Sequence, residues 1–166
     1  MGEAIVRRAE PGDAEALCRV FAGTRAVSGT LQLPYPSVEA WRRRLSEPSE
    51  SVHSLVAVVE GEVVGGLGLT VSDTPRRHVG ESGMAVRDDR QGIGAGTALM
   101  EAALELADRW IGLTRIELHV YTDNEQAISL YKRFGFVVEG THHAFALRDG
   151  SYVAAFSLAR HVSNTL

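Results

Sequence analysis

The chain has 166 residues, of which 45% are hydrophobic and 23% are charged, with 17 glycines, one cysteine and a formal charge of -4. The length predicts a single domain over residues 1–166, and the composition excludes a disordered tail, a collagen-like repeat and a disulfide-bonded scaffold. Because the sequence has no basic excess, no membrane-length apolar run and no signal-peptide core, we expect a cytoplasmic protein that binds neither nucleic acid nor a membrane.

The first elements predicted are a strand and an amphipathic helix. Residues 1–8 indicate a short strand, and a turn at 11–13 precedes a helix whose N-cap is Asp13. Apolar residues recur along that helix at i, i+3, i+4 and i+7. Cys18 lies on this apolar stripe with no His or carboxylate beside it in the sequence, so we interpret it as a buried residue and not a nucleophile.

A rigid loop, a helix and three strands come next. Two prolines stiffen residues 31–36, and Ser37 is the expected cap of a short helix over 37–46. Residues 54–60 and 63–71 predict two antiparallel strands on either side of a glycine turn, and a third strand is expected over 77–86.

The second half of the chain alternates helices with strands. A helix follows residues 87–96 and is expected to reach Trp110. Its predicted buried stripe consists of Leu99, Ala102, Ala103, Leu106 and Trp110. Alternating apolar residues predict a strand over 116–121, and Asn124 caps a helix that ends at Gly135. Two final strands follow at residues 142–147 and 152–158. This order is typical of one mixed α/β sheet.

Three glycines at alternate positions, Gly92, Gly94 and Gly96, lie between a predicted strand and a predicted helix. A backbone without Cβ atoms approaches a ligand closely, and the N–H groups at a helix start attract a pyrophosphate. The cluster alone is equally typical of a glycine-rich surface turn. No Gly-Lys-Ser/Thr follows it, and it does not open an N-terminal βα unit, so neither a Walker A loop nor a Rossmann site is indicated.

Two segments in order carry a family resemblance. Residues Gln91–Gly96 fit the pattern Gln/Arg-x-x-Gly-x-Gly/Ala, and residues 124–136 read Asn-x-x-Ala-x-x-Leu-Tyr-x-x-x-Gly-Phe after a strand. The chain thereby resembles the GNAT superfamily of N-acetyltransferases over nearly its whole length. The segments that look closest to a branch acting on small amines such as L-amino acids are 30–34, 116–118 and 146–153. The resemblance implies a single-domain α/β fold with a mostly antiparallel sheet, a splayed central strand pair and flanking helices.

The resemblance further implies acetyl-CoA as cofactor and direct transfer of its acetyl group to a primary amine of a small molecule, with a homodimer as one option. The glycine loop and Thr97 would hold the pyrophosphate, and the N–H of Val86 or a neighbour would polarise the thioester carbonyl. The implied cofactor-binding residues are Met84, Ala85, Val86, Gln91, Gly92, Ile93, Gly94, Ala95, Gly96, Thr97, Asn124 and Tyr131.

Tyr131 has two interpretations. It lies one helical turn after Ala127 and on the same stripe as Phe134, which is typical of a core aromatic residue. By the resemblance, it is instead the general acid that protonates the departing CoA thiolate.

The attacking amine must lose a proton, so a base or a water chain is required. Glu81 is the first candidate for base or amine anchor because it lies on the strand that leads to the thioester, and His119 and Glu117 come next. Each would otherwise be an ordinary residue of a solvated strand or the partner of an arginine. The acceptor site is expected at residues 31–36, 66–68 and 152–154. Its predicted substrate-binding residues are Leu31, Leu33, Tyr35, Glu81 and His119. No metal site is predicted.

Two alternatives remain open from the sequence. The same fold could acetylate a protein N-terminus or a ribosomal protein, which predicts an open groove and faster turnover of a peptide than of free amino acids. A non-catalytic acyl-CoA-binding module predicts cofactor binding without thiol release.

Overall fold

The computed structural model describes residues 2–162, and seven strands among them form one sheet in the order β1-β2-β3-β4-β5-β7-β6. All neighbouring strands are antiparallel except β4 and β5, which are parallel. The predicted mixed, mostly antiparallel sheet is therefore confirmed. The strands are β1 (Ile5–Arg8), β2 (Val52–Val59), β3 (Glu62–Val71), β4 (Val79–Val86), β5 (Arg115–Tyr121), β6 (Val137–Arg148) and β7 (Ser151–His161).

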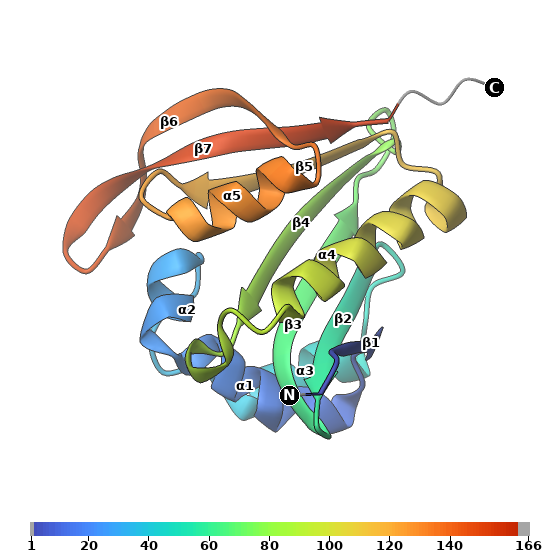
Figure 1. Ribbon diagram of the computed structural model, residues 1–166, viewed down its shortest axis with the longest axis vertical. Helices are drawn as coiled ribbons and strands as arrows, with labels where there is room; N and C mark the ends of the chain where they lie inside the picture. The colour runs from blue at the N-terminus through green and yellow to red at the C-terminus, as the bar shows by residue number, and fades with distance from the viewer. Residues whose placement is uncertain (1, 163–166) are drawn as a thin grey trace.

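Helices cover both faces of the sheet (Figure 1). The helices α4 and α5 lie on one face, and α1 and α3 lie on the other. The α-helices are α1 (Ala14–Ala22), α2 (Thr24–Gly29), α3 (Val38–Ser46), α4 (Ala95–Glu105) and α5 (Glu125–Arg133). Short 3-10 turns occupy Pro11–Asp13 and Asp88–Arg90, and a π-helical turn at Leu106–Ile111 extends α4. Within residues 2–162, no helix is long and apolar enough to cross a membrane.

Two apolar clusters hold the sheet between its helical layers. The larger cluster packs α4 and α5 against one face through buried side chains such as Leu69, Leu99 and Leu118. The second packs α1 and α3 against the other face, around Val20 and Val56. Burying each such side chain contributes about 1.5–3 kcal/mol, so these clusters fix how the helices lie on the strands that carry the site.

The helix starts confirm two predicted caps and correct a third. Side-chain oxygens of Ser37 and Asn124 accept N–H groups in the first turns of α3 and α5, as expected. The carboxylate of Asp13 accepts the N–H of Glu10 at 2.8 Å and pairs with Arg7, so it makes no side-chain cap on α1. The arginine competes for the carboxylate that the helix start would otherwise use.

The prediction that Trp110 is buried is wrong, because its side chain is 79% exposed. Residues 106–111 form a π-helical turn, in which each residue turns through a smaller angle than in an α-helix. Trp110 therefore does not return to the buried stripe, and Ala107 is buried instead. Leu99 and Ala103, which precede the π-turn, are buried as predicted.

Candidate active site

One cavity of about 1160 Å³ opens where β4 and β5 separate. The two strands pair only from Val79 to Glu81 on β4 and from Arg115 to Glu117 on β5, and beyond these residues they diverge (Figure 1). The predicted splay of a central strand pair is thus confirmed. It matters because it interrupts the sheet at its centre and leaves part of β4 without a partner strand on one side.

The open edge of β4 offers backbone N–H groups to the cavity. Arg87 donates its N–H to Val64 of β3 at 2.7 Å, which fixes the alternation of the antiparallel ladder. Ala85 therefore turns its polar groups toward β3, and the N–H groups of Met84 and Val86 face the opening. An unpaired strand edge of this kind is suited to an extended ligand with amide groups.

The glycine loop joins this edge to the start of α4. Gly92 and Gly94 have φ values of +74° and +87°, a conformation that L side chains rarely adopt. Gly94 is the N-cap of α4 and has no side chain to bind the free N–H groups of the first turn. The side chain of Gln91 donates to the carbonyl of Val86 at 2.8 Å and so ties the loop to β4.

The structure brings nearly all predicted cofactor-binding residues to this cavity, and only Ile93 does not line it. Ile93 packs against the larger apolar cluster. Close packing also explains the glycine at position 96, since a Cβ there would lie 3.3 Å from Met84 Cε and 3.4 Å from Leu130 Cδ2. The loop therefore combines positions that expose backbone with positions that allow α4 to approach β4 and α5.

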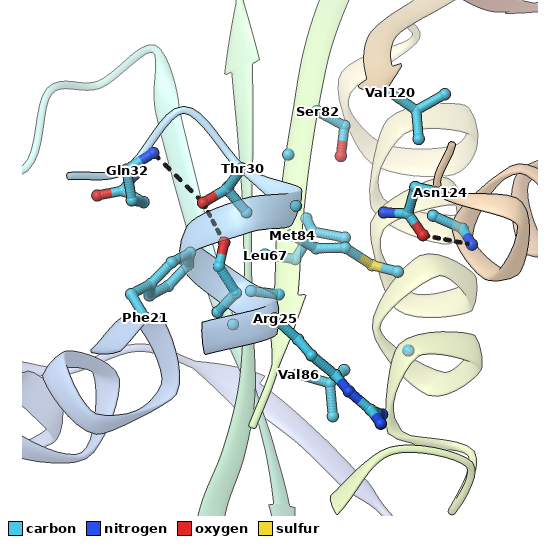
Figure 2. Close-up of a pocket in the computed structure, with 18 of the residues that line it drawn as sticks. Phe21, Arg25, Thr30, Gln32, Leu67, Ser82, Met84, Val86, Val120 and Asn124 are labelled. Atoms are coloured by element: carbon cyan, nitrogen blue, oxygen red, sulfur yellow. Dashed lines mark hydrogen bonds between the residues drawn. The ribbon is translucent and has the colours of Figure 1, made fainter. Parts of the chain in front are cut away.

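Three arginines near the loop also line the cavity and were not predicted from the sequence. They are Arg25, Arg90 and Arg133. Figure 2 shows the Arg25 side chain reaching from α2 to the region beside Val86. Arg90 pairs with Glu62 at 3.2 Å. Guanidinium groups bind phosphates well, so this end of the cavity suits an anion. Arg25 was not identified because α2 has no apolar periodicity that would predict a helix.

Tyr131 is a core aromatic residue that also lines the cavity, and its role as general acid stays a prediction. It is 6% exposed and its ring packs against Phe136 with centroids 5.8 Å apart, as a core aromatic residue does. It also lines the cavity. Burial raises the pKa of its hydroxyl to about 12, because the phenolate form would lose hydration. The hydroxyl therefore stays protonated at neutral pH and is available as a donor.

Glu81 and His119 meet on the other side of β4. The Glu81 side chain is 65% exposed, and its Oε1 lies 3.9 Å from His119 Nδ1. Both residues line the cavity. His119 stacks on Phe145 with ring centroids 5.1 Å apart, and a β-bulge at Ala144, whose φ is +50°, interrupts β6 beside this ring. Phe145 was not predicted because a bulge has no simple sequence pattern.

Glu117 is not available as a base. Its carboxylate accepts from Arg76 at 2.6 Å and from Arg115 at 2.7 Å, and these bonds hold its pKa below the usual value despite partial burial. It does not line the cavity, so this part of the expectation is corrected. Its direct partner on β4, Glu81, does line the cavity, and the two carboxylates differ in that Arg76 and Arg115 bind the one of Glu117.

The expected acceptor loop lies at the cavity only in part. Leu31 lines it, whereas Leu33 and Tyr35 are 81% and 98% exposed and do not. Tyr152, in the expected 152–154 segment, is also exposed and lies off the cavity. Tyr35 lies between the two prolines and has a left-handed φ of +61°, and its side chain faces solvent.

Long-range contacts close one side of the cavity. Tyr121 donates its hydroxyl to the carbonyl of Thr30 at 3.2 Å, and Arg148 donates to the carbonyl of Ser28 at 3.2 Å while pairing with Asp123. We call α2 with residues 30–32 the roof. Figure 2 shows Thr30 and Gln32 of the roof on one side of β4, and Val120 and Asn124 on the other.

Cys18 is buried and lies outside the cavity, as the sequence predicts for a core residue. Its Sγ donates to the carbonyl of Pro36 at 3.3 Å. Because it does not reach the cavity, it is not placed to form an acetyl-enzyme. In the part of the chain that the structure describes, no group of three or more His, Cys, Asp or Glu side chains is arranged to hold a metal ion.

Comparison with known proteins is consistent with this geometry. Residues 21–136 match the model of the acetyltransferase (GNAT) family. The chain is 41% identical to the L-amino acid N-acetyltransferase AaaT of Escherichia coli K12 over 161 residues, which cover 96% of this chain and 99% of that protein. A GNAT-family acetyltransferase structure from Streptococcus pneumoniae is 27% identical with a TM-score of 0.83, covering 96% of this chain and 100% of that one. A GNAT superfamily phosphinothricin acetyltransferase from Sinorhizobium meliloti, solved in complex with AcCoA, is 20% identical with a TM-score of 0.85. The match covers 96% of this chain and 88% of that one, and at this identity it supports the fold alone.

Proposed function

This chain belongs to the GNAT acetyltransferase family and is an N-acetyltransferase, and on that premise we propose that it transfers acetyl from acetyl-CoA directly to the amine of an L-amino acid. The observation that carries the proposal is the single cavity that joins the glycine loop, the open edge of β4, Tyr131 and Glu81. The similarity to AaaT supports an amino acid as acceptor.

The residues at the glycine loop fit the pyrophosphate of acetyl-CoA, the co-substrate that the GNAT family uses. Gly92 and Gly94 leave no side chain between a ligand and the backbone N–H groups, and the α4 N-terminus adds a positive dipole. Arg25 and Arg90 supply positive charge at the same end. Acetyl-CoA supplies an acetyl group already activated as a thioester.

We infer a role for each open N–H from the order of the groups along β4. Val86 lies next to the loop, because its carbonyl accepts from Gln91. An extended arm that leaves the loop therefore meets the N–H of Val86 first and that of Met84 deeper in the cavity. We assign the Val86 N–H to a pantetheine amide and the Met84 N–H to the thioester carbonyl, where one such donor stabilises the developing charge by about 3 kcal/mol.

Tyr131 acts as the general acid. Its hydroxyl donates to the sulfur as negative charge develops there and passes a proton to the thiolate as it leaves. The raised pKa, about 12, means that the hydroxyl is protonated at neutral pH and so holds the proton that the departing thiolate needs. Glu81 lies on the opposite side of β4, where it holds the acceptor ammonium and takes its proton, with His119 as its neighbour at 3.9 Å.

The roof favours a small acceptor over a peptide. Tyr121 and Arg148 bind the carbonyls of Thr30 and Ser28, so α2 is tied across the cavity to β5 and to the β6–β7 hairpin. A protein N-terminus needs an open exit for the chain behind the amine. Free amino acids need no such exit.

The test is thiol release from acetyl-CoA with a panel of free amino acids, polyamines and short peptides, with the products identified by mass. We expect rapid release with one or more L-amino acids and an N-acetyl product. Faster turnover of peptides would favour the protein-acetylating alternative. Tight cofactor binding with no release for any amine would favour the binding module and overturn the proposal.

A further inference from the structure

Two glycines in the sheet leave a bare surface inside the cavity. Gly68 of β3 and Gly83 of β4 are direct partners in the antiparallel ladder, and both line the cavity. A Cβ added at either position would meet no protein atom within 4 Å. Neither has a left-handed φ that would demand glycine.

Other glycines of the same strands differ in this respect. A Cβ at Gly66 would lie 2.7 Å from Leu17 Cδ2, and one at Gly80 would lie 2.7 Å from Leu113 Cδ1. Packing against helices and neighbouring segments explains why those positions carry no side chain. Neither packing nor backbone conformation explains Gly68 and Gly83, where the missing side chains simply leave open space.

The bare strip lies next to the proposed amine anchor. Glu81 comes two residues before Gly83 on β4, and residues two apart on a strand share a face. Further along the same face, Ala85 is buried in the cluster beneath α1. Gly68 and Gly83 therefore occupy the uncovered part of the sheet, between the helix-covered region and Glu81. We call this pair the floor.

We propose that the floor receives the side chain of the acceptor amino acid and sets how large that side chain can be. The inference rests on the proposed function. An acceptor whose ammonium lies at Glu81 extends the rest of its structure over Gly83 and Gly68, and the stacked rings of Phe21 and Trp41, 5.0 Å apart, line the cavity beyond. The floor thus suits amino acids with side chains larger than that of alanine.

The variants Gly68→Ala and Gly83→Ala test this directly. Each adds one methyl group that points into the cavity and touches no protein atom, so the fold and the acetyl-CoA KM should not change. For leucine or phenylalanine as acceptor we expect kcat/KM to fall by roughly tenfold or more, because one methyl group in a binding pocket discriminates by about 10–200-fold. For glycine or alanine we expect little change.

Gly140→Ala is the matched control. Gly140 is also a strand glycine, on β6, with no left-handed φ and nothing within 4 Å of an added Cβ, but it lies outside the cavity. It should leave the kinetics of every acceptor unchanged. Thermal unfolding of all three variants reports whether any of them alters the fold.

The outcomes separate the two proposals. Loss of large acceptors with retention of small ones supports the floor. Unchanged kinetics, or an equal loss for small and large acceptors in a folded variant, overturns it while the proposed function stands. A wild-type protein that acetylates no amino acid overturns the proposed function and the floor with it.

Discussion

The two sides of the cavity are built in different ways. The cofactor side comes mainly from two short stretches, residues 84–97 and 124–131, to which α2 adds the Arg25 side chain. Much of what these stretches offer is backbone: open N–H groups, left-handed glycines and a helix start. The acceptor side is assembled from distant segments, as the bonds of Arg148 to Ser28 and of Tyr121 to Thr30 illustrate, spanning 120 and 91 residues. A shared cofactor can thus be bound by a local motif, whereas the choice of acceptor depends on tertiary packing.

Because the two sides of the cavity are built separately, substitutions on the cofactor side and on the acceptor side should change different kinetic constants. Tyr131→Phe should have the largest effect. Loss of the proton donor should lower kcat by roughly 10²–10⁴-fold, the usual range for a general acid, with little change in the acetyl-CoA KM. Because the pKa of Tyr131 is about 12, the wild type should show no loss of turnover from its ionisation at any pH below about 10. Full activity of the folded variant would assign Tyr131 to packing alone.

Glu81→Gln should have the next largest effect, and on the acceptor side. Without the carboxylate, kcat/KM for the amino acid should fall by about 10–100-fold, since proton removal and ammonium binding both weaken. The acetyl-CoA KM should stay the same. Steady-state kinetics with each substrate varied in turn check this split. An unchanged pH–rate profile and normal kcat/KM would remove Glu81 from the mechanism and leave the proton to a water chain.

Gly94→Ala should affect the cofactor side alone. An alanine at φ +87° is strained and places a methyl group at the loop, so the acetyl-CoA KM should rise by roughly tenfold. Gly112→Ala is the matched control, because Gly112 has a φ of +79° but lies outside the cavity. It should cost similar stability with a normal KM. Equal KM values in the two variants would contradict the proposed pyrophosphate site.

Arg148→Ala should have the smallest effect, and mainly on the acceptor. Removing the guanidinium breaks its pair with Asp123 and its bond to the Ser28 carbonyl, which loosens the roof. The amino acid KM should rise by about two- to fivefold, the range expected for an exposed ion pair and one hydrogen bond. Arg42→Ala, which breaks an exposed pair on α3 away from the cavity, is the control. Because Arg25 of the roof lies at the cofactor end, a smaller rise in the acetyl-CoA KM is compatible with this account, whereas a rise as large as that for the amino acid would contradict the separation of the two sides.

The contrast between the sides also explains what the sequence could predict. On the cofactor side, the glycine spacing, the Asn124 cap and the position of Tyr131 on α5 are local features, and the structure brings these residues to one cavity. Helix and strand periodicity likewise predicted most elements, because apolar faces must be buried whatever the fold.

On the acceptor side, local patterns were less informative. The six residues of α2 have no apolar stripe, and the helix is held by tertiary contacts such as the bond from the Arg25 N–H to Asp88 at 3.0 Å. Leu33 and Tyr35 were predicted to bind substrate because they are apolar, but the proline-rich loop turns them to solvent. The sequence does not distinguish an apolar residue that faces a ligand from one that faces water.

The central claim is that acetyl-CoA and the amino acid occupy the cavity together, one from each side of β4, and that acetyl passes directly between them. Initial rates measured while both substrates are varied test it most directly. The account predicts intersecting double-reciprocal lines, because both substrates must bind before a product leaves. Parallel lines, together with an acetylated protein after incubation with acetyl-CoA alone, would indicate a covalent intermediate and contradict it.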